Sequence, residues 1–528
     1  MFEVFLSYRR ETGTEFCSFL YQRLSMEGYN VFFDQKSLRQ GVFDEQIDRA
    51  ISECVYVLVM LASGDLDRCF KDPENDWILH EIRLAMHYGK IVIPVKINQH
   101  FFFDAHYELP ELAFLGKQEL CDLSGADAAS LIDSKLLGFM ATPPSAALAE
   151  AYNKGVLGKE YLQWEIETLQ TIYPDLEFVQ EFRKVFPIVV FPGSKKVKYP
   201  FDELNDPELL EDISDPVEID DSDVVDDFKM IVGPNIHFPN LYGFTNVGLI
   251  FDEENNVQGF RAKPRTYRET VFSGHILHYE LWHAFKLLSG LRPGTLDDLP
   301  LRRKIHGGQP NLEILTSGCR RSSLCDICIA VLAYDEIEDD YALAVATRSK
   351  QVACYPGYLG IVPSGGFELY ELESKQTPLV IKKNFSILAA LFREYIEEIF
   401  GDENFDKPTG NDDLKRLYRN PHVQEIRRQI GKTCFFEFLG VTVDVISLRP
   451  TFAFVLRIDD PKFLYENEIK KNQENIDVRF ISLNDFEESV VESECSSPLM
   501  AESAGVYRLL KMNHLFQETR QHMDKDVR

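Results

Sequence analysis

Two groups of charged side chains have types and spacings suited to chemistry. The first is Glu81, which stands four residues after Trp77 in the helical stretch NDWILHEIRLAMHYGK, residues 75–90. Residues at i and i+4 share one face of a helix, so the carboxylate and the indole should be neighbours. A carboxylate in such a place can act as an acid or base, or stabilise a developing cation. The alternative is a buried tryptophan beside a solvated glutamate, which the spacing alone favours.

The second group is a set of glutamates in NFSILAALFREYIEEIF, residues 384–400. An apolar stripe predicts that one face of this helix is buried. The opposite face carries Arg393, Glu394, Glu397 and Glu398. Carboxylates at these spacings converge on one side of a helix, and an oxygen-only set suits Mg²⁺ or Mn²⁺. The alternative is a charged face exposed to solvent, which the spacing alone favours.

The elements that must position Glu81 alternate along the first hundred residues. Strands buried on both faces and separated by helices imply a parallel sheet with right-handed crossovers. In such sheets a ligand binds outside the carboxyl ends of the strands. The apolar runs predict strands over 4–6, 31–33, 55–61 and 91–95, and the amphipathic segments predict helices over 11–27, 43–51 and 75–87.

Polar side chains follow the first two of these strands. Ser7, Tyr8, Arg9 and Arg10 come directly after the first strand, and Asp34 follows the second. Because the carboxyl ends of parallel strands meet at one edge, these side chains should collect where a ligand binds.

Composition excludes several classes of partner. The 528 residues include 85 acidic and 56 basic side chains, and the formal charge is −29. Such a charge disfavours nucleic acid and anionic membranes as partners. The apolar runs are far shorter than the roughly 20 residues of a membrane span, and the start lacks a signal peptide. We therefore expect a soluble cytoplasmic protein with reduced thiols.

Three of the ten cysteines are close together. Cys319, Cys325 and Cys328 fall in CRRSSLCDIC, and the last two have C-x-x-C spacing. A zinc site needs a fourth ligand, and no Cys or His pair follows at a suitable distance. The two thiols lead directly into IAVLAYD, which predicts a buried strand, so ordinary cysteines are favoured over a metal site.

The chain divides into three predicted regions, 1–142, 143–238 and 239–528. The Pro-Pro and small residues of ATPPSAALAEAYNKG, residues 141–155, mark the first boundary. The middle region is predicted to be a helical and acidic connector, and its residues 201–227 hold thirteen acidic side chains and no basic one. Such a run is typical of a solvated linker, and the alternative is that it masks a basic surface.

Several motifs in the first region resemble a TIR domain of the prokaryotic kind, over about residues 2–140. They are VFLSYRR, VFFDQKSLRQG, FDEQIDRAISECVYVLVMLAS and DWILHEIRLAM, in that order. The resemblance implies an α/β flavodoxin-like fold and cleavage of NAD at the nicotinamide–ribose bond. It implies Glu81 as the catalytic glutamate of a W-x-x-x-E pattern. It further implies an NAD site with Ser7, Tyr8, Arg9, Arg10, Asp34 and Trp77, and a gating loop with Lys36, Arg39 and Gly41.

This chemistry needs a carboxylate. Departure of nicotinamide leaves an oxocarbenium-like ribose, which Glu81 would stabilise. The family resemblance also implies that a neighbouring TIR domain completes the site, so a homo-oligomer is expected when the enzyme is active. The alternative is a TIR domain that acts only in assembly.

The helix with the glutamates, preceded by PSGGFELYE, resembles a Nudix box. The core Arg393-Glu394-Tyr395-Ile396-Glu397-Glu398 is present, and Gly365 and Glu371 have the G-x5-E spacing. Gly401 falls one residue late, and the stretch from Glu371 to Arg393 is longer than in the family. The resemblance implies an α+β Nudix-like domain in which Glu394, Glu397 and Glu398 hold Mg²⁺ or Mn²⁺ and which binds a nucleotide diphosphate.

Together these features predict a TIR-domain NAD glycohydrolase in prokaryotic defence or signalling. Its Nudix-like half would sense a nucleotide diphosphate or hydrolyse it slowly. One alternative is a non-catalytic TIR assembly module joined to a nucleotide-binding domain. Another is a Nudix pyrophosphatase that its TIR domain recruits.

Overall fold

The computed structural model divides the chain into two compact units. The first contains Met1–Gly155 and Asp226–His237, and the second contains Val156–Val225 and Phe238–Arg528. No helix in the described part of the chain is both long and apolar enough to span a membrane. The residues described are 3–34, 43–73, 75–101, 109–118, 120–125, 131–136, 140, 151–152, 154–156, 158–212, 217, 223–232, 242–348, 357–371, 376–402, 405, 408–409, 412–467, 475–492 and 498–519.

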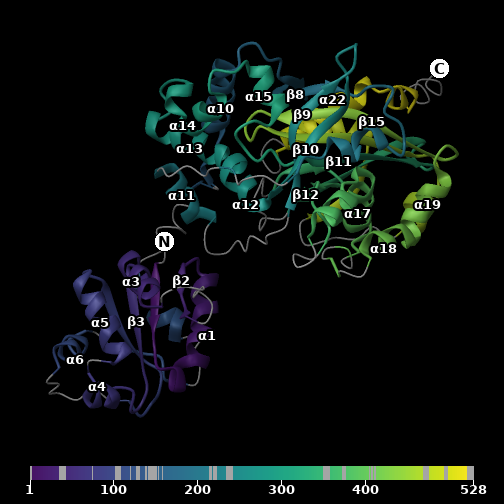
Figure 1. The fold of residues 1–528 in the computed structure, drawn as a ribbon. Helices are drawn as coiled ribbons and strands as arrows, with labels where there is room; N and C mark the ends of the chain where they lie inside the picture. The colour runs from purple at the N-terminus through teal and green to yellow at the C-terminus, as the bar shows by residue number, and fades with distance from the viewer. Residues whose placement is uncertain are drawn as a thin grey trace. The chain divides into compact units, whose positions relative to one another are not determined.

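A five-stranded parallel sheet forms the centre of the first unit, which confirms the predicted parallel sheet and adds a fifth strand to the four that were predicted (Figure 1). The strand order is β2-β1-β3-β4-β5, with Val4 opposite both Val31 and Tyr56. The elements are β1 (Val4–Ser7), α1 (Arg10–Met26), β2 (Val31–Phe32), α3 (Phe43–Glu53), β3 (Tyr56–Leu61), α4 (Asp67–Lys71), α5 (Trp77–His87), β4 (Ile91–Lys96), α6 (Pro110–Leu115), β5 (Cys121–Asp122) and a π-helical turn, η1 (Ile132–Leu136).

Helices cover both faces of this sheet because its strands are apolar on both sides. All six residues of β3 are buried. Val4 and Leu6 pack with Leu20 and Leu24 of α1 on one face. Phe5 packs on the other face in a cluster that includes residues of α3 and α5. The carboxyl ends of the strands therefore remain the edge at which polar side chains can gather.

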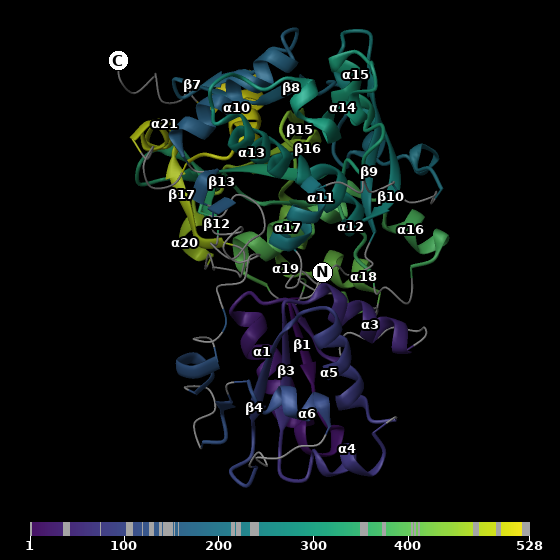
Figure 2. The same ribbon diagram turned by 90° about the vertical axis from the view of Figure 1, so that its left-hand side faces the viewer.

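The second unit is built on an eight-stranded mixed sheet (Figures 1 and 2). Its main path is β13-β12-β11-β16-β15-β8, while β14 pairs with β11 and β17 pairs with β12. Only β11 and β16 run parallel among the named strand pairs of this sheet. The strands are β8 (Ile188–Pro192), β11 (Asp326–Asp335), β12 (Asp340–Arg348), β13 (Leu359–Ile361), β14 (Ser364–Gly366), β15 (Cys434–Asp444), β16 (Arg449–Ile458) and β17 (Asn475–Ser482).

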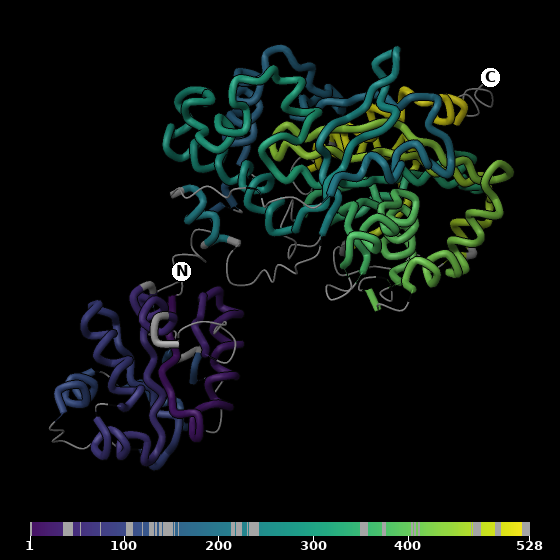
Figure 3. Tube along the Cα trace, viewed as in Figure 1, coloured from purple at the N-terminus to yellow at the C-terminus, as the bar shows by residue number. Residues whose placement is uncertain are grey.

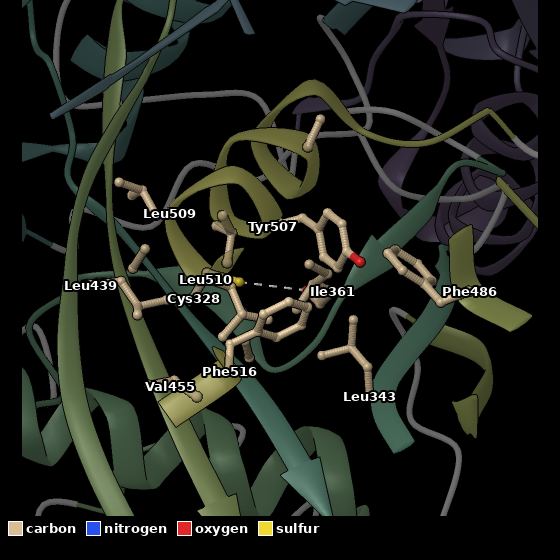
Figure 4. Close-up of a cluster of buried hydrophobic side chains, with 14 of the residues drawn as sticks. Cys328, Leu343, Ile361, Leu439, Val455, Phe486, Tyr507, Leu509, Leu510 and Phe516 are labelled. Atoms are coloured by element: carbon tan, nitrogen blue, oxygen red, sulfur yellow. Dashed lines mark hydrogen bonds between the residues drawn. The ribbon is translucent and has the colours of Figure 1, made fainter. Parts of the chain in front are cut away.

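A hydrophobic core joins this sheet to the helix α22 (Ala501–Met512). Tyr507 and Leu510 of α22 belong to one cluster with Leu343 of β12 and Val455 of β16 (Figure 4). Cys328, which the sequence placed at the start of a buried strand, lies within β11 in the same cluster. The helix with the glutamates is α17 (Ile387–Phe400), and most of its residues are buried.

Part of the predicted connector, Val156–Val225, belongs to the second unit. The tube in Figure 3 shows this blue stretch among the teal and green chain of that unit. The strand β8 pairs with β15, with Val441 opposite Phe191, because its apolar residues complete the sheet edge. The helix α10 (Lys159–Ile172) buries Trp164 and Leu169. The sequence predicted this stretch to be a connector separate from the C-terminal region, whereas the structure includes it in the second unit.

A long hairpin and a bent helix complete the part of this unit that matters below. Two antiparallel strands form the hairpin, β9 (Tyr242–Phe251) and β10 (Val257–Thr266). The bent helix consists of α12 (Tyr267–Thr270), η4 (Val271–His275) and α13 (Ile276–Leu288). The other elements are β6 (Val179–Glu181), β7 (Lys184–Phe186), η2 (Asp202–Leu204), η3 (Pro207–Leu209), α11 (Asp223–Val232), η5 (Leu296–Asp298), α14 (Pro300–His306), α15 (Asn311–Ser317), α16 (Pro378–Asn384), α18 (Asp413–Arg419), α19 (Pro421–Gln429), α20 (Phe463–Glu466) and α21 (Leu483–Glu492).

Candidate functional site

Glu81 is a buried carboxyl group in the first unit. It lies on α5, and 8% of the residue is exposed. Burial raises the pKa of Glu81 to about 8, the neighbouring Ser7 hydroxyl partly offsets the rise, and the Asp34 carboxylate adds to it. Since Ser7 ends β1 and Asp34 follows β2, the structure brings these three predicted site residues to one edge of the sheet. A glutamate that is largely protonated at neutral pH is typical of functional sites.

The environments of Trp77 and Glu81 reverse the alternative that their spacing favoured. Trp77 is 42% exposed, and its ring stands edge-on to His80 with 5.6 Å between centroids. Glu81 is the covered member of the pair. A solvated glutamate beside a buried tryptophan is therefore the wrong description of this helix face.

Arg9 is committed to a buried contact with Asp76. Its Nη2 lies 2.5 Å from Oδ2 of Asp76, and its Nε donates to the carbonyl oxygen of Asp65. Asp76 is the N-cap of α5 and accepts a hydrogen bond from the Leu79 amide at 3.1 Å. Arg9 therefore holds the start of the helix that carries Glu81, which leaves its guanidinium poorly placed to bind a pyrophosphate.

Tyr8 and Arg10 both contact Asp34 at the edge of the sheet. The Tyr8 hydroxyl donates to Asp34, and Nη2 of Arg10 lies 2.7 Å from its Oδ2. Burial and the Asp34 carboxylate raise the pKa of Tyr8. The Arg10 side chain is 63% exposed, so it is the arginine of the pair that an anion in solvent can reach.

The predicted gating-loop residues Lys36, Arg39 and Gly41 lie outside the described residues.

A cavity of about 480 Å³ in the second unit contains part of the predicted Nudix-like site. Arg393, Glu394 and Glu397 line it, together with Gly365 and Gly366 of β14. Glu398 is not among its lining residues. The structure therefore brings two of the three predicted metal ligands to this cavity.

Arg393 and Glu394 are engaged with each other. Nη2 of Arg393 lies 2.7 Å from Oε1 of Glu394, and it also donates to the Gly366 carbonyl oxygen at 3.3 Å. A Cβ atom at position 365 would lie 2.2 Å from Oε2 of Glu394. The β14 backbone thus passes directly over this carboxylate, and a larger residue at position 365 would have to displace it.

Glu398 has a structural contact. Its Oε2 accepts a hydrogen bond from the Ser364 amide at 2.7 Å, and the residue is 3% exposed. The Ser364 hydroxyl in turn donates to Glu502 at 3.0 Å. Glu398 therefore holds β14 in place.

The predicted metal set is not assembled by these contacts. Within the described ranges, no group of three or more His, Cys, Asp or Glu side chains is arranged to hold a metal ion. Glu394 pairs with Arg393, Glu397 lies 3.9 Å from the same guanidinium, and Glu398 accepts from a backbone amide. The three glutamates as they stand do not fit a shared Mg²⁺ or Mn²⁺.

Other residues of this cavity were missed by the sequence analysis. Arg449 contacts both His275 and Asp326. Burial lowers the pKa of His275, and the Arg449 charge lowers it further, so the imidazole is neutral and can accept from the guanidinium. His278 lies 3.7 Å from Asp444. The i, i+3 spacing of the two histidines was the one signal in the sequence that could have suggested them.

Comparison with known proteins identifies the first unit. The TIR domain family matches residues 4–134. Over 110 residues the chain is 34% identical to "NAD(+) hydrolase SARM1" of Danio rerio, a match that covers 21% of this chain and 15% of that protein. Over 109 residues it is 33% identical to "NAD(+) hydrolase tir-1" of Caenorhabditis elegans, which covers 20% of this chain and 10% of that protein. The match thus spans less than a sixth of the length of these relatives.

Among solved structures, a NUDIX hydrolase from Alicyclobacillus acidocaldarius is 13% identical to this chain, with a TM-score of 0.21, over 35% of this chain and 89% of that one. The match of residues 4–134, together with the five parallel strands, shows that the N-terminal unit of this chain is a TIR domain.

Proposed function

We propose that the TIR domain hydrolyses NAD⁺ at the nicotinamide–ribose bond, with Glu81 as the catalytic carboxylate. The observation that carries this proposal is the buried Glu81 at the carboxyl edge of the parallel sheet, beside Ser7. Two relatives that match the same segment are named NAD(+) hydrolases, which supports the same reaction.

The raised pKa of Glu81 suits a positively charged substrate. In the free protein the carboxyl group is mostly neutral near pH 7. The nicotinamide ring of NAD⁺ carries a positive charge, so its arrival favours the ionised form and releases the proton to solvent. As the bond to nicotinamide breaks, the carboxylate stabilises the oxocarbenium-like ribose. Water then adds to the ribose, which yields ADP-ribose, nicotinamide and one proton.

Other residues at this edge have distinct proposed roles. Trp77 offers an exposed ring against which a planar group can stack. Arg10 supplies positive charge for the pyrophosphate. Asp34, which accepts from Tyr8, fixes the position of the Arg10 side chain. Arg9 is a positioning residue for α5. The gating loop with Lys36, Arg39 and Gly41, and completion of the site by a second TIR domain, stay predictions.

For the second unit we propose binding of a nucleotide diphosphate in the 480 Å³ cavity without rapid hydrolysis. Arg348 lines the cavity and can face the diphosphate. Rapid hydrolysis by a Nudix-type site needs carboxylates that are free to hold metal, whereas Glu394 and Glu398 bond to Arg393 and Ser364. The biological setting remains as the sequence suggested, a cytoplasmic defence or signalling protein.

The proposal is tested with the full chain and NAD⁺ over a series of protein concentrations, with nicotinamide and ADP-ribose separated by chromatography. We expect nicotinamide release that rises more steeply than protein concentration, because a second TIR domain would complete the site. Glu81→Gln should lower turnover by about a hundredfold or more. Glu11→Gln, which removes an exposed carboxylate of the same unit, is the matched control. Release by Glu81→Gln at the wild-type rate, with unchanged circular dichroism, would disprove the catalytic role.

A further inference from the structure

A second cavity, of about 640 Å³, lies in the second unit and shares no lining residue with the cavity beside α17. It is bounded by the β9–β10 hairpin, the bent helix η4–α13, the helix α14 and the segment that follows α15. Figures 1 and 2 show these elements as neighbours in the teal part of the chain. Its volume is in the range of small-molecule sites.

Positive charge is concentrated on this cavity. Five basic side chains line it and one acidic side chain, Glu211, does so; the basic residues are Lys263, Arg265, Lys304, Arg320 and Arg321. Such an excess is unusual in a chain with a formal charge of −29. Cations that converge on a cavity attract anionic ligands.

The basic residues differ in how far their charge is already used. Arg321 is buried and donates to the carbonyl oxygens of Leu448 and Ile314, so it is structural. Lys304 and Arg320 are exposed at the rim. Arg320 reaches the carbonyl oxygen of Ile305 at 3.4 Å, and this neutral acceptor does not cancel the guanidinium charge.

The two inner cations have carboxylate partners. Nη1 of Arg265 lies 3.1 Å from Glu269, which also caps α12. Nζ of Lys263 lies 2.9 Å from Oε2 of Glu211. Glu211 is held there by its own backbone, since its amide donates to the Ala262 carbonyl oxygen at 2.8 Å. A carboxylate from the acid-rich stretch 201–227 thus occupies the position that an anionic ligand would take.

The remaining wall is apolar. It is formed by Val247, Phe272, Ile276, Leu277, Leu301 and Ile305. A cavity with cations on one side and an apolar wall on the other fits a ligand that has phosphates and a planar, largely apolar group.

We propose that this cavity binds a nucleotide with two or more phosphates. Lys263, Lys304 and Arg320 surround the phosphates, and the base lies against the wall that contains Phe272. Glu211 competes with the phosphates for Lys263, so the acid-rich stretch weakens binding from within the chain.

Cys319 allows binding to be located. It lines the cavity and is partly exposed, whereas the other cysteines in the described ranges are buried. The full chain is alkylated with N-ethylmaleimide, and the modification of the Cys319 peptide is read by mass spectrometry. The arms contain ATP, ADP-ribose, inorganic tripolyphosphate or adenosine. We expect ATP and ADP-ribose to protect Cys319 at lower concentration than tripolyphosphate or adenosine, since only these two ligands carry both phosphates for the cations and a base for the apolar wall.

Variants with opposite expected effects make the test sharper. Lys304→Glu with Arg320→Glu should raise the concentration of ATP needed for protection about tenfold or more, because two charges are reversed at the rim. Arg303→Glu, on the same helix but outside the lining and paired with Asp297, should change it little. Glu211→Gln should lower the required concentration by removing the competing carboxylate, and the adjacent Asp212→Asn is its control. Glu397→Gln, in the other cavity, should have no effect.

Three results would overturn the proposal. One is the absence of Cys319 protection by both ATP and ADP-ribose at millimolar concentration. Another is equal protection by tripolyphosphate and ATP, which would show that the apolar wall takes no part. The third is weaker protection in Glu211→Gln than in the unchanged chain.

Discussion

Arg9 and Asp76 form a buried ion pair that joins the end of β1 to the start of the helix carrying Glu81. Their side chains are 9% and 1% exposed, and the contact is 2.5 Å. Asp76 also caps α5 through the Leu79 amide. The position of Glu81 at the edge of the sheet therefore depends on a contact between residues that are 67 positions apart in sequence.

Loss of this pair should loosen α5. Arg9→Met leaves the Asp76 carboxylate buried without its partner, which typically costs about 3–5 kcal/mol. We expect faster hydrogen exchange in peptides of α5 and a lower rate of NAD⁺ cleavage. The double variant Arg9→Met, Asp76→Asn should restore much of the protection of the α5 amides against exchange. Asparagine still caps the helix but leaves no unpaired charge.

Arg10→Met is the matched control for that change. Its ion pair with Asp34 is at the surface, so the expected loss of stability is below about 1 kcal/mol. If the amides of α5 exchanged hydrogen at the same rate in Arg9→Met and in Arg10→Met, the proposed positioning role of Arg9 would be wrong.

Glu81 should make the TIR domain less stable as the pH rises. Its folded pKa of about 8 lies above the ordinary value of 4.5, so the unfolded chain releases this proton at lower pH than the folded chain. The stability that the neutral carboxyl contributes is complete below about pH 4.5 and is lost as the pH rises to about 8. Glu81→Gln removes this dependence. In thermal unfolding scans, the unfolding temperature of Glu81→Gln should rise relative to that of the unchanged chain between these two pH values. That of Glu11→Gln should not. A constant difference across the window would contradict the raised pKa.

The rate of NAD⁺ cleavage should also depend on the ionisation of Glu81. Because the carboxylate form stabilises the oxocarbenium, kcat/KM should increase with pH and level off above a midpoint of about 8 in the free enzyme. NAD⁺ binding at pH 7 should release protons, which calorimetry in buffers of different ionisation enthalpy measures. A flat kcat/KM profile through the midpoint would exclude Glu81 as the ionising group.

In the second unit, Glu398 and Glu397 should have separable roles. Glu398→Ala removes the acceptor of the Ser364 amide, so we expect a loss of about 1–3 kcal/mol and faster exchange in β14. Glu397→Ala removes a carboxylate that lines the cavity and should leave β14 protected. Addition of EDTA should not change exchange in either variant, since protein groups and not a metal hold this strand. Equal exchange in the two variants would show that Glu398 has no such structural role.

Several features of the site could be predicted from the sequence. The strands of the TIR domain were predictable because residues such as those of β3 form continuous apolar runs, which only strands buried on both faces require. The meeting of Ser7 and Asp34 at one edge followed from the order of parallel strands. The catalytic role of Glu81 stays a prediction, and it rests on the resemblance to TIR domains, because the spacing from Trp77 alone favoured a solvated glutamate.

Only the tertiary structure decided how these residues are used. Helical spacing shows that Trp77 and Glu81 share a face, but which of them is covered depends on the strands packed against α5. The pairing of Arg9 with Asp76 and the bond from Ser364 to Glu398 join distant segments, so no local pattern could reveal them. The 640 Å³ cavity draws its cations from β10, α14 and the segment after α15, and Glu211 reaches it from the acid-rich stretch. Composition alone suggests that such a stretch is solvated, because the positive charges that attract it become neighbours only when the chain folds.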